Sequence, residues 1–146
     1  MPSKKDLSEQ EIRTKYITPA IEKAGWDRMT QLGEDVPLTD GKIFIRGKLY
    51  ASGKLKRADY ILYFKPNIPI AIIEAKDNNH SVRSGIQQAL GYRELLKDVP
   101  CVYSSNGDAF FEHDFTSSNG KIERQIPLNA FPTPEELWNR YKKLNK

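Results

Sequence analysis

The sequence contains little cysteine and no long apolar run among its 146 residues. Its single cysteine, Cys101, cannot form an internal disulfide, and its setting between Pro100 and Val102 favours a buried strand residue over a nucleophile. No stretch approaches membrane-spanning length, and the first residues lack the apolar segment of a secretory signal. We therefore expect a cytoplasmic protein with no membrane partner.

Other absences narrow the function further. The chain has no repeat, no low-complexity segment and no Gly-x-x-x-x-Gly-Lys-Ser/Thr motif, so we do not expect this domain to hydrolyse ATP itself. Its two histidines lie far apart and neither has a cysteine close by, which argues against a transition-metal site. A hydrophobic content of 38% over this length can bury one core but not a second large domain, so residues 1–146 are expected to form a single domain.

Positive charge is unevenly distributed, although the total of 23 Lys and Arg against 19 Asp and Glu is only modestly basic. The segment Gly41–Ala58 contains no acid and holds six basic residues, namely Lys42, Arg46, Lys48, Lys54, Lys56 and Arg57. Two interpretations remain open for it. The segment is either a ribbon that faces DNA phosphates, or a solvated hairpin whose lysines discourage edge pairing.

Two carboxylates are expected to meet on neighbouring strands. The apolar run Ile68–Ile73 is typical of a buried central strand, and it leads directly into Glu74 and Lys76. The preceding Pro66-Asn67 favours a turn, and an antiparallel hairpin centred there places Asp59 opposite Glu74. Glu74 and Lys76, two residues apart, share one face of the strand.

This set of residues suits a hard metal ion. The carboxylates of Asp59 and Glu74, with the backbone carbonyl of Ala75, offer the oxygen ligands that Mg²⁺ prefers, and Mn²⁺ can substitute. Lys76 beside the ion can orient or help deprotonate a water that attacks a phosphodiester. From spacing alone, an acid and a lysine at a strand end are often just a solvated edge.

Four segments together resemble a known family. They are Lys56–Tyr60, Ile73–His80, Gln88–Tyr92 and Ser104–Gly107, and they are similar to the N-terminal nuclease domain of the type I restriction enzyme motor (R) subunit. That domain belongs to the PD-(D/E)xK nuclease superfamily, and the resemblance covers nearly the whole chain. One departure is Ala58, which stands where the family name has proline; this proline is a backbone feature rather than a ligand.

The resemblance implies a fold and a set of site residues. The fold would be α/β, with a central mixed sheet flanked by helices in a restriction-endonuclease-like core. Asp59, Glu74 and Lys76 take the catalytic positions, and Gln88 and Tyr92 match a Gln-x-x-x-Tyr helix motif that supports the site or contacts DNA. Relatives in the superfamily often place a further acid on the first helix. Glu11 or Glu9 could fill that role, although a capping box with Ser8 already explains Glu11.

The resemblance also implies an activity and partners. It indicates a Mg²⁺-dependent endonuclease that cuts double-stranded DNA, within a larger subunit that carries helicase-like motor domains. Methyltransferase and specificity subunits would complete the enzyme, and ATP and S-adenosylmethionine would serve only that full complex. Two alternatives stay open: a non-catalytic DNA-binding or subunit-docking module, and a stand-alone structure-specific nuclease.

Local patterns predict the flanking elements. A helix should begin at the Ser8 capping box, pass Pro19 with a kink and end at Gly25-Trp26. A second helix is predicted over Ser81–Asp98, and a third opens at Thr133-Pro134. Short strands are expected over Cys101–Ser104 and Ala109–Asp114, with a turn between them.

Overall fold

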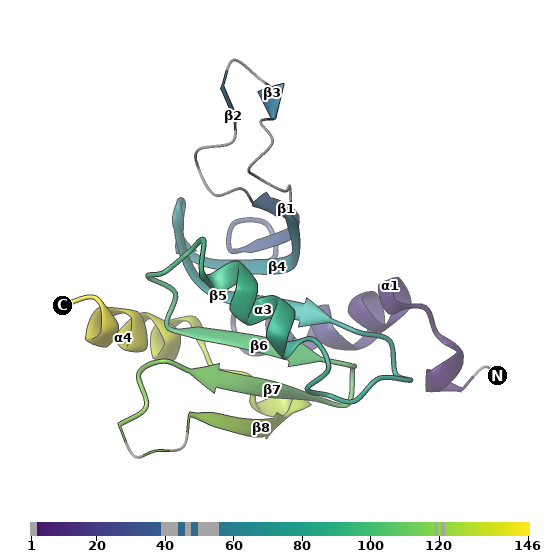
Figure 1. The fold of residues 1–146 in the computed structure, drawn as a ribbon. Coiled ribbons are helices and arrows are strands. Elements are labelled where there is room, and N and C mark those ends of the chain that lie inside the picture. The colour runs from purple at the N-terminus through teal and green to yellow at the C-terminus, as the bar shows by residue number, and fades with distance from the viewer. Residues whose placement is uncertain (1–2, 39–43, 46–47, 50–55, 119, 121) are drawn as a thin grey trace.

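The computed structural model describes residues 3–38, 44–45, 48–49, 56–118, 120 and 122–146. Its centre is a six-stranded mixed sheet in the order β1-β4-β5-β6-β7-β8 (Figure 1). The bounds are β1 Leu32–Leu38, β4 Lys56–Lys65, β5 Ile68–Ala75, β6 Cys101–Ser105, β7 Ala109–Asp114 and β8 Glu123–Pro127. Two further strands, β2 (Phe44–Ile45) and β3 (Lys48–Leu49), pair only with each other. Only β5 and β6 run parallel within the large sheet, so the predicted α/β fold with a mixed sheet is confirmed.

Helices cover both faces of the sheet (Figure 1). One face carries α3 (Ile86–Arg93), and the other carries the N-terminal helices and α4. The remaining helical elements are η1 Lys4–Asp6, α1 Glu9–Ile12, η2 Arg13–Ile17, α2 Thr18–Lys23, η3 Leu128–Ala130 and α4 Pro134–Leu144. From Ala71 to Ile73 the side chains of β5 alternate between the two layers: Ile72 packs in the α3 layer, whereas Ala71 and Ile73 pack in the opposite one.

The strand β5 lies inside the sheet, as its apolar sequence predicts. It pairs with β4 on one side and β6 on the other, and its last six residues, from Ile70 to Ala75, are all buried. A strand with neighbours on both sides and helices on both faces needs apolar residues at successive positions. The sequence Ile70–Ile73 meets that need, and Glu74 is the exception that calls for an explanation.

The β4-β5 hairpin has the predicted turn and register. Pro66 and Asn67 form the turn, and Asn67 adopts the left-handed conformation, with φ of 67°, that asparagine tolerates. Tyr60 pairs with Ile73, so the same register continued by one residue brings Asp59 opposite Glu74. An irregularity around Tyr63 lies on the turn side and leaves this end of the hairpin unaffected.

The N-terminal helix begins and ends where its sequence predicts. Ser8 and Glu11 form the capping box, and Gly25 ends the helix with φ of 109°. Between them the helix passes through a π-helical turn, Arg13–Ile17, before Pro19. The helices of the described residues are too short or too polar to span a bilayer.

The helix predicted over Ser81–Asp98 is wrong in its length, because α3 spans only Ile86–Arg93. At its start, the Gly85 N–H donates to the Ser104 hydroxyl at 2.8 Å instead of continuing a helix backwards. At its end, the N–H groups of Leu95 and Leu96 bond to carbonyls three residues back, which is turn geometry.

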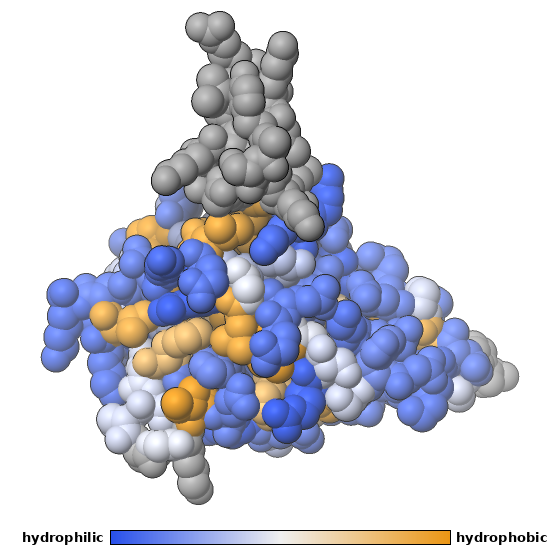
Figure 2. Space-filling view, viewed as in Figure 1, coloured by the Kyte–Doolittle hydropathy of each residue, from blue (hydrophilic) through white to orange (hydrophobic). Residues whose placement is uncertain are grey.

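Figure 2 shows the face of the molecule that carries α3. Apolar side chains gather over the centre and left of this face, while the side toward the N-terminus is mostly hydrophilic.

The other predicted elements are present. The strands β6 and β7 cover the predicted Cys101–Ser104 and Ala109–Asp114, and Gly107 in the turn between them has φ of 90°. The C-terminal helix α4 begins after Thr133, whose side chain accepts the N–H of Glu136. These local signals lie within single segments of the chain, where propensity and capping act directly.

Candidate functional site

Asp59 and Glu74 meet across the β4-β5 ladder. The backbone N–H of Asp59 donates to Oε1 of Glu74 at 2.9 Å. The backbone N–H of Ala75 donates in return to Oδ2 of Asp59 at 2.8 Å. Each carboxylate therefore accepts a hydrogen bond from the backbone of the neighbouring strand, and the two acids are held side by side on rigid elements.

Glu74 is buried in an environment that disfavours its charge. Its exposed fraction is 4%, and burial together with the neighbouring charge of Asp59 raises its pKa to about 8. The Asp59 N–H bond and the charge of Lys76 act in the opposite direction but do not offset burial. A cation placed between the two carboxylates would relieve this penalty.

Lys76 follows the last residue of β5. Its backbone N–H donates to the Ser105 carbonyl at 2.9 Å, which fixes the chain at the point where β5 leaves the sheet. The half-buried Lys76 side chain lies close enough to favour the charged form of Glu74. The predicted combination of two acids and a lysine is thus assembled at one strand end.

A groove beside this strand end collects four of the other predicted residues. It encloses about 470 Å³ and is lined by Lys56, Arg57, Gln87, Gln88, Gly91 and Tyr92. Burial raises the pKa of Tyr92, and the charges of Glu74 and Asp59 raise it further, so the phenol lies within electrostatic reach of the acids. Gln88 and Tyr92, one helical turn apart on α3, therefore share a groove with the basic start of β4.

The predicted basic ribbon is described only in part. Lys56 and Arg57 are exposed, and Arg57 donates to the Asp35 carbonyl at 3.4 Å. Arg46 and Lys54 lie outside the described residues, as does the side chain of Lys48. DNA contact by Lys56, Arg57 and these three residues stays a prediction.

Of the two acids on the first helix, Glu9 rather than Glu11 lies within electrostatic reach of Asp59. The carboxylate of Glu11 accepts the Ser8 N–H at 3.1 Å and lies 3.7 Å from Lys15, and the Ser8 bond lowers its pKa. Desolvation raises the pKa of Glu9, and the charge of Asp59 raises it as well. Glu11 thus serves the helix cap, and Glu9 is the acid closer to the candidate site.

Arg13 is a site residue that the sequence reasoning missed. Its side chain is buried, with 4% exposed, and Nη2 donates to the Asp59 carbonyl at 3.0 Å. Sequence offered one signal: Arg13 precedes Ile17 and Ile21 by four and eight residues, so a charged residue stands on the buried stripe of the helix.

The donor set fits a hard cation held by few protein ligands. The described residues contain no group of three or more His, Cys, Asp or Glu side chains that could hold a metal ion. The candidate ligands are therefore the two carboxylates of Asp59 and Glu74 and the carbonyl of Ala75. Mg²⁺ suits such a set, because it retains several waters and is bound through one or two carboxylates together with substrate phosphate.

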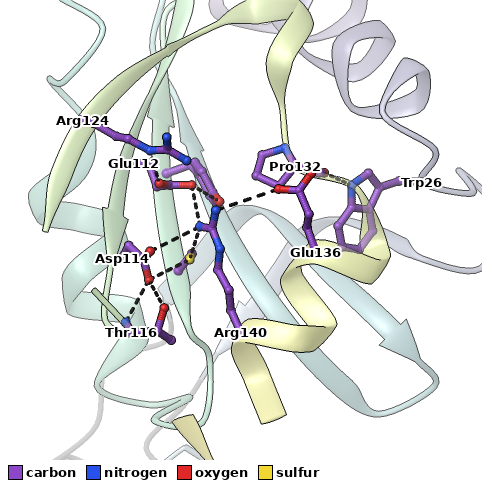
Figure 3. A network of polar contacts seen from close by, with 10 residues as sticks. Trp26, Glu112, Asp114, Thr116, Arg124, Pro132, Glu136 and Arg140 are labelled. Atoms are coloured by element: carbon purple, nitrogen blue, oxygen red, sulfur yellow. Dashed lines mark hydrogen bonds and ion pairs between the residues drawn. The ribbon is translucent and has the colours of Figure 1, made fainter. Parts of the chain in front are cut away.

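A second polar cluster lies on the opposite face of the sheet (Figure 3). Glu112, with 1% exposed, accepts hydrogen bonds from the Tyr103 hydroxyl at 2.7 Å, Arg124 at 2.8 Å and Arg140 at 3.0 Å. Its charge is thus fully compensated, and the bond from Arg140 ties α4 to the sheet. Cys101 lies beside Arg140, and burial raises the pKa of its thiol to about 12, which supports the predicted structural role.

Comparison with known proteins gives concordant results from sequence and structure. No family model matches the chain. The chain is 48% identical over 137 residues to the type I restriction enzyme EcoAI endonuclease subunit of Escherichia coli, which covers 93% of the chain and 17% of that subunit. The solved fragment of a putative HsdR subunit of a type I restriction enzyme from Vibrio vulnificus YJ016 matches with a TM-score of 0.74 and 36% identity. That match covers 92% of the chain and 25% of the solved one.

The chain therefore spans less than a fifth of the curated relative, but almost all of it takes part in the match. Identity of this level together with the same fold is strong evidence of common descent. Over nearly its whole length, the chain belongs with the endonuclease subunits of type I restriction enzymes and corresponds to one part of such a subunit.

Proposed function

We propose that this chain is the Mg²⁺-dependent endonuclease domain of a type I restriction enzyme R subunit, of the PD-(D/E)xK superfamily. It would cleave phosphodiester bonds of double-stranded DNA in defence against foreign DNA. The observation that carries this proposal is the meeting of the Asp59 and Glu74 carboxylates at a strand end that continues into Lys76. The kinship with restriction endonuclease subunits supports the same reaction class.

The residues divide the work of hydrolysis between them. Asp59, Glu74 and the Ala75 carbonyl would hold the ion, which when bound supplies Lewis-acid stabilisation of the charge on the scissile phosphate. The backbone N–H groups of Asp59 and Ala75 keep the two carboxylates in place, at 2.9 and 2.8 Å, without rearrangement. Lys76 would orient the attacking water, and its positive charge would favour loss of a proton from that water to solvent. Glu9 is a candidate for a further, water-mediated contact.

The groove beside the acids gives DNA a path to them. Lys56 and Arg57 would contact backbone phosphates, while Gln88 and Tyr92 would support the site or contact the strand to be cut. Phosphate contacts fix the position of the duplex but carry no direct sequence information. Choice of the DNA site would therefore reside elsewhere in the enzyme.

The partners follow from the proposed place in the enzyme. The motor domains of the same subunit would deliver DNA with the use of ATP, and methyltransferase and specificity subunits would control recognition. ATP and S-adenosylmethionine would act on those parts and not on this domain.

Loss of one acid tests the proposal. The Asp59→Ala variant should lose Mg²⁺-dependent cleavage in the assembled enzyme and retain DNA binding by this domain. The exposed Asp98, which follows α3 in the chain, provides the control, since Asp98→Ala should cleave normally. Equal cleavage by the two variants would refute a nuclease centre at Asp59 and favour a binding or docking module. Metal-dependent cleavage by the domain without ATP or partner subunits would instead favour a stand-alone nuclease.

A further inference from the structure

Arg13 connects the first helix to two strands directly behind the candidate metal ligand. Its Nη2 donates to the Asp59 carbonyl at 3.0 Å, and its Nη1 donates to Oδ1 of Asp35 at 3.0 Å. Glu34 lies 3.4 Å away, and the guanidinium stacks over the Tyr60 ring at 4.9 Å. Arg13 is only 3% exposed, and its hydrogen bonds thus fix the side chain of Asp35 and the backbone of Asp59.

The local helix geometry places Arg13 there. Pro19 has no N–H to offer to a carbonyl of the preceding turn, and the helix opens into the π-helical segment Arg13–Ile17. The Thr18 N–H bonds back five residues to the Arg13 carbonyl. Such π turns are rare and often found at functional sites, because they redirect a side chain without ending the helix.

The partner Asp35 is itself in an unusual conformation. It has φ of 51° inside β1, between the paired residues Glu34 and Val36 and therefore opposite Asp59. A left-handed aspartate costs roughly 1 kcal/mol, so the surrounding structure must stabilise it. The charged bond from Arg13 supplies that stabilisation, and it links β1 and β4 at the level of the candidate metal ligand.

We propose that Arg13 is a positioning residue for the metal centre, which holds Asp59 in its binding orientation through the Asp59 carbonyl and the Asp35 anchor. This inference rests on the proposed function. Arg13 would act through Asp59 without contacting ion or DNA. The planar fork is essential to the role, because a lysine cannot direct two fixed donors at two acceptors.

For Arg13→Lys, charge and positioning predict different effects on metal binding. The Arg13 guanidinium lies 3.7 Å from Oδ1 of Asp59, so its charge alone repels a cation bound to that carboxylate. If only this charge mattered, Arg13→Lys would bind metal as the parent does. If the fork positions Asp59, Arg13→Lys must weaken metal binding although the charge is conserved.

The test is calorimetric titration of the whole chain with Mn²⁺ in the absence of DNA, at a temperature at which each variant is folded. Arg13→Lys should weaken Mn²⁺ binding at least about tenfold, as loss of residues that orient metal ligands typically does. Arg28→Lys, at an exposed arginine of the same chain, should leave it unchanged. Unchanged or tighter Mn²⁺ binding by Arg13→Lys would overturn the inference, even if its melting temperature falls.

A second variant tests the same link from the exposed side. The Asp35 side chain is 57% exposed, and Asp35→Asn keeps a residue that tolerates the left-handed conformation. It should weaken Mn²⁺ binding about threefold by removing the charge that anchors Arg13. The double variant with Arg13→Lys should bind within about twofold of Arg13→Lys alone, since both changes break one link. Fully additive losses would contradict the linkage.

Mn²⁺ binding by the parent protein distinguishes a failure of the Arg13 role from a failure of the metal centre itself. Mn²⁺ binding by the parent that is lost in Asp59→Asn but unchanged in Arg13→Lys would overturn the role of Arg13 alone. No Mn²⁺ binding by the parent would overturn the metal centre and this inference with it.

Discussion

Replacing Glu74 by glutamine should abolish cleavage and at the same time stabilise the metal-free protein near neutral pH. Glutamine conserves the shape of Glu74 and the oxygen that accepts the Asp59 N–H. It removes a carboxylate that is 4% exposed and lies against Asp59, where ionisation is unfavourable. The substitution therefore separates the needs of the fold from those of the reaction.

The size of the effect follows from the pKa of Glu74. Burial raises this pKa from an ordinary 4.5 to about 8, so the folded protein holds a proton that the unfolded chain has released. The stability that Glu74 contributes is thus complete below pH 4.5 and is lost as the pH rises toward 8. One pKa unit corresponds to about 1.4 kcal/mol, so the loss at neutral pH is at most about 3 kcal/mol. Glu74→Gln should recover most of it at neutral pH and almost none near pH 4.

The assay is urea unfolding followed by tryptophan fluorescence at several pH values, with a chelator present. Trp26 is a suitable reporter, since it is 3% exposed and donates to the Pro132 carbonyl at 2.9 Å. Glu112→Gln is the matched control, because the same substitution there removes a buried carboxylate that two arginines compensate. It should destabilise the protein by about 2–4 kcal/mol.

The two substitutions are thus expected to have opposite signs. Destabilisation by Glu74→Gln at neutral pH, or a difference from the parent that does not change between pH 4 and pH 8, would contradict a raised pKa of Glu74 in the folded protein. Added Mg²⁺ should raise the stability of the parent protein and not that of the Glu74→Gln variant.

Three other predictions concern the surroundings of the acids. Gly85→Ala should destabilise the fold by about 1–3 kcal/mol and slow cleavage, because a Cβ there would lie 2.9 Å from Ser104 Oγ and 3.0 Å from Glu74 Cβ. Urea unfolding measures the loss of stability, and plasmid cleavage measures the loss of activity. Lys56→Ala and Arg57→Ala should each weaken DNA binding and reduce the slope of log affinity against log salt by about 1, and an unchanged slope would exclude the phosphate contact. Removing metal with EDTA should abolish cleavage but leave DNA binding by the groove at Lys56 and Arg57 measurable in a filter or gel assay. Cleavage that persists in EDTA would exclude a metal mechanism.

The sequence was sufficient for features that depend on neighbouring residues. The Ser8 capping box, the Pro66-Asn67 turn and the register of Asp59 against Glu74 all follow from local propensities and the two-residue period of strands. Glu74 stands out in the sequence because it follows a run of apolar residues that is typical of a buried strand. A carboxylate at the end of such a strand requires compensation for its burial, and this can be inferred without a structure.

Features that depend on distant segments were not accessible in this way. The predicted second helix was too long, since the bond from Gly85 to Ser104 that limits α3 joins residues far apart in sequence. Strands β1 and β8 were not predicted: β1 carries glycine and proline, and four of the five β8 residues are exposed, so neither shows a clear alternation. Arg13 was missed because its acceptors, Asp35 and Asp59, lie on two different strands.

A metal-dependent nuclease centre in this chain can be tested by nicking of supercoiled plasmid with Mg²⁺ or Mn²⁺, comparing the parent with Lys76→Ala. It is made first with this chain alone and then with the motor domains, the partner subunits and ATP. We predict metal-dependent nicking by the parent and none by Lys76→Ala. If the motor governs cleavage, the parent should nick only when the motor domains, partner subunits and ATP are present. Equal nicking by parent and variant, or no nicking by an assembled complex that translocates on DNA, would contradict a nuclease centre at Asp59, Glu74 and Lys76.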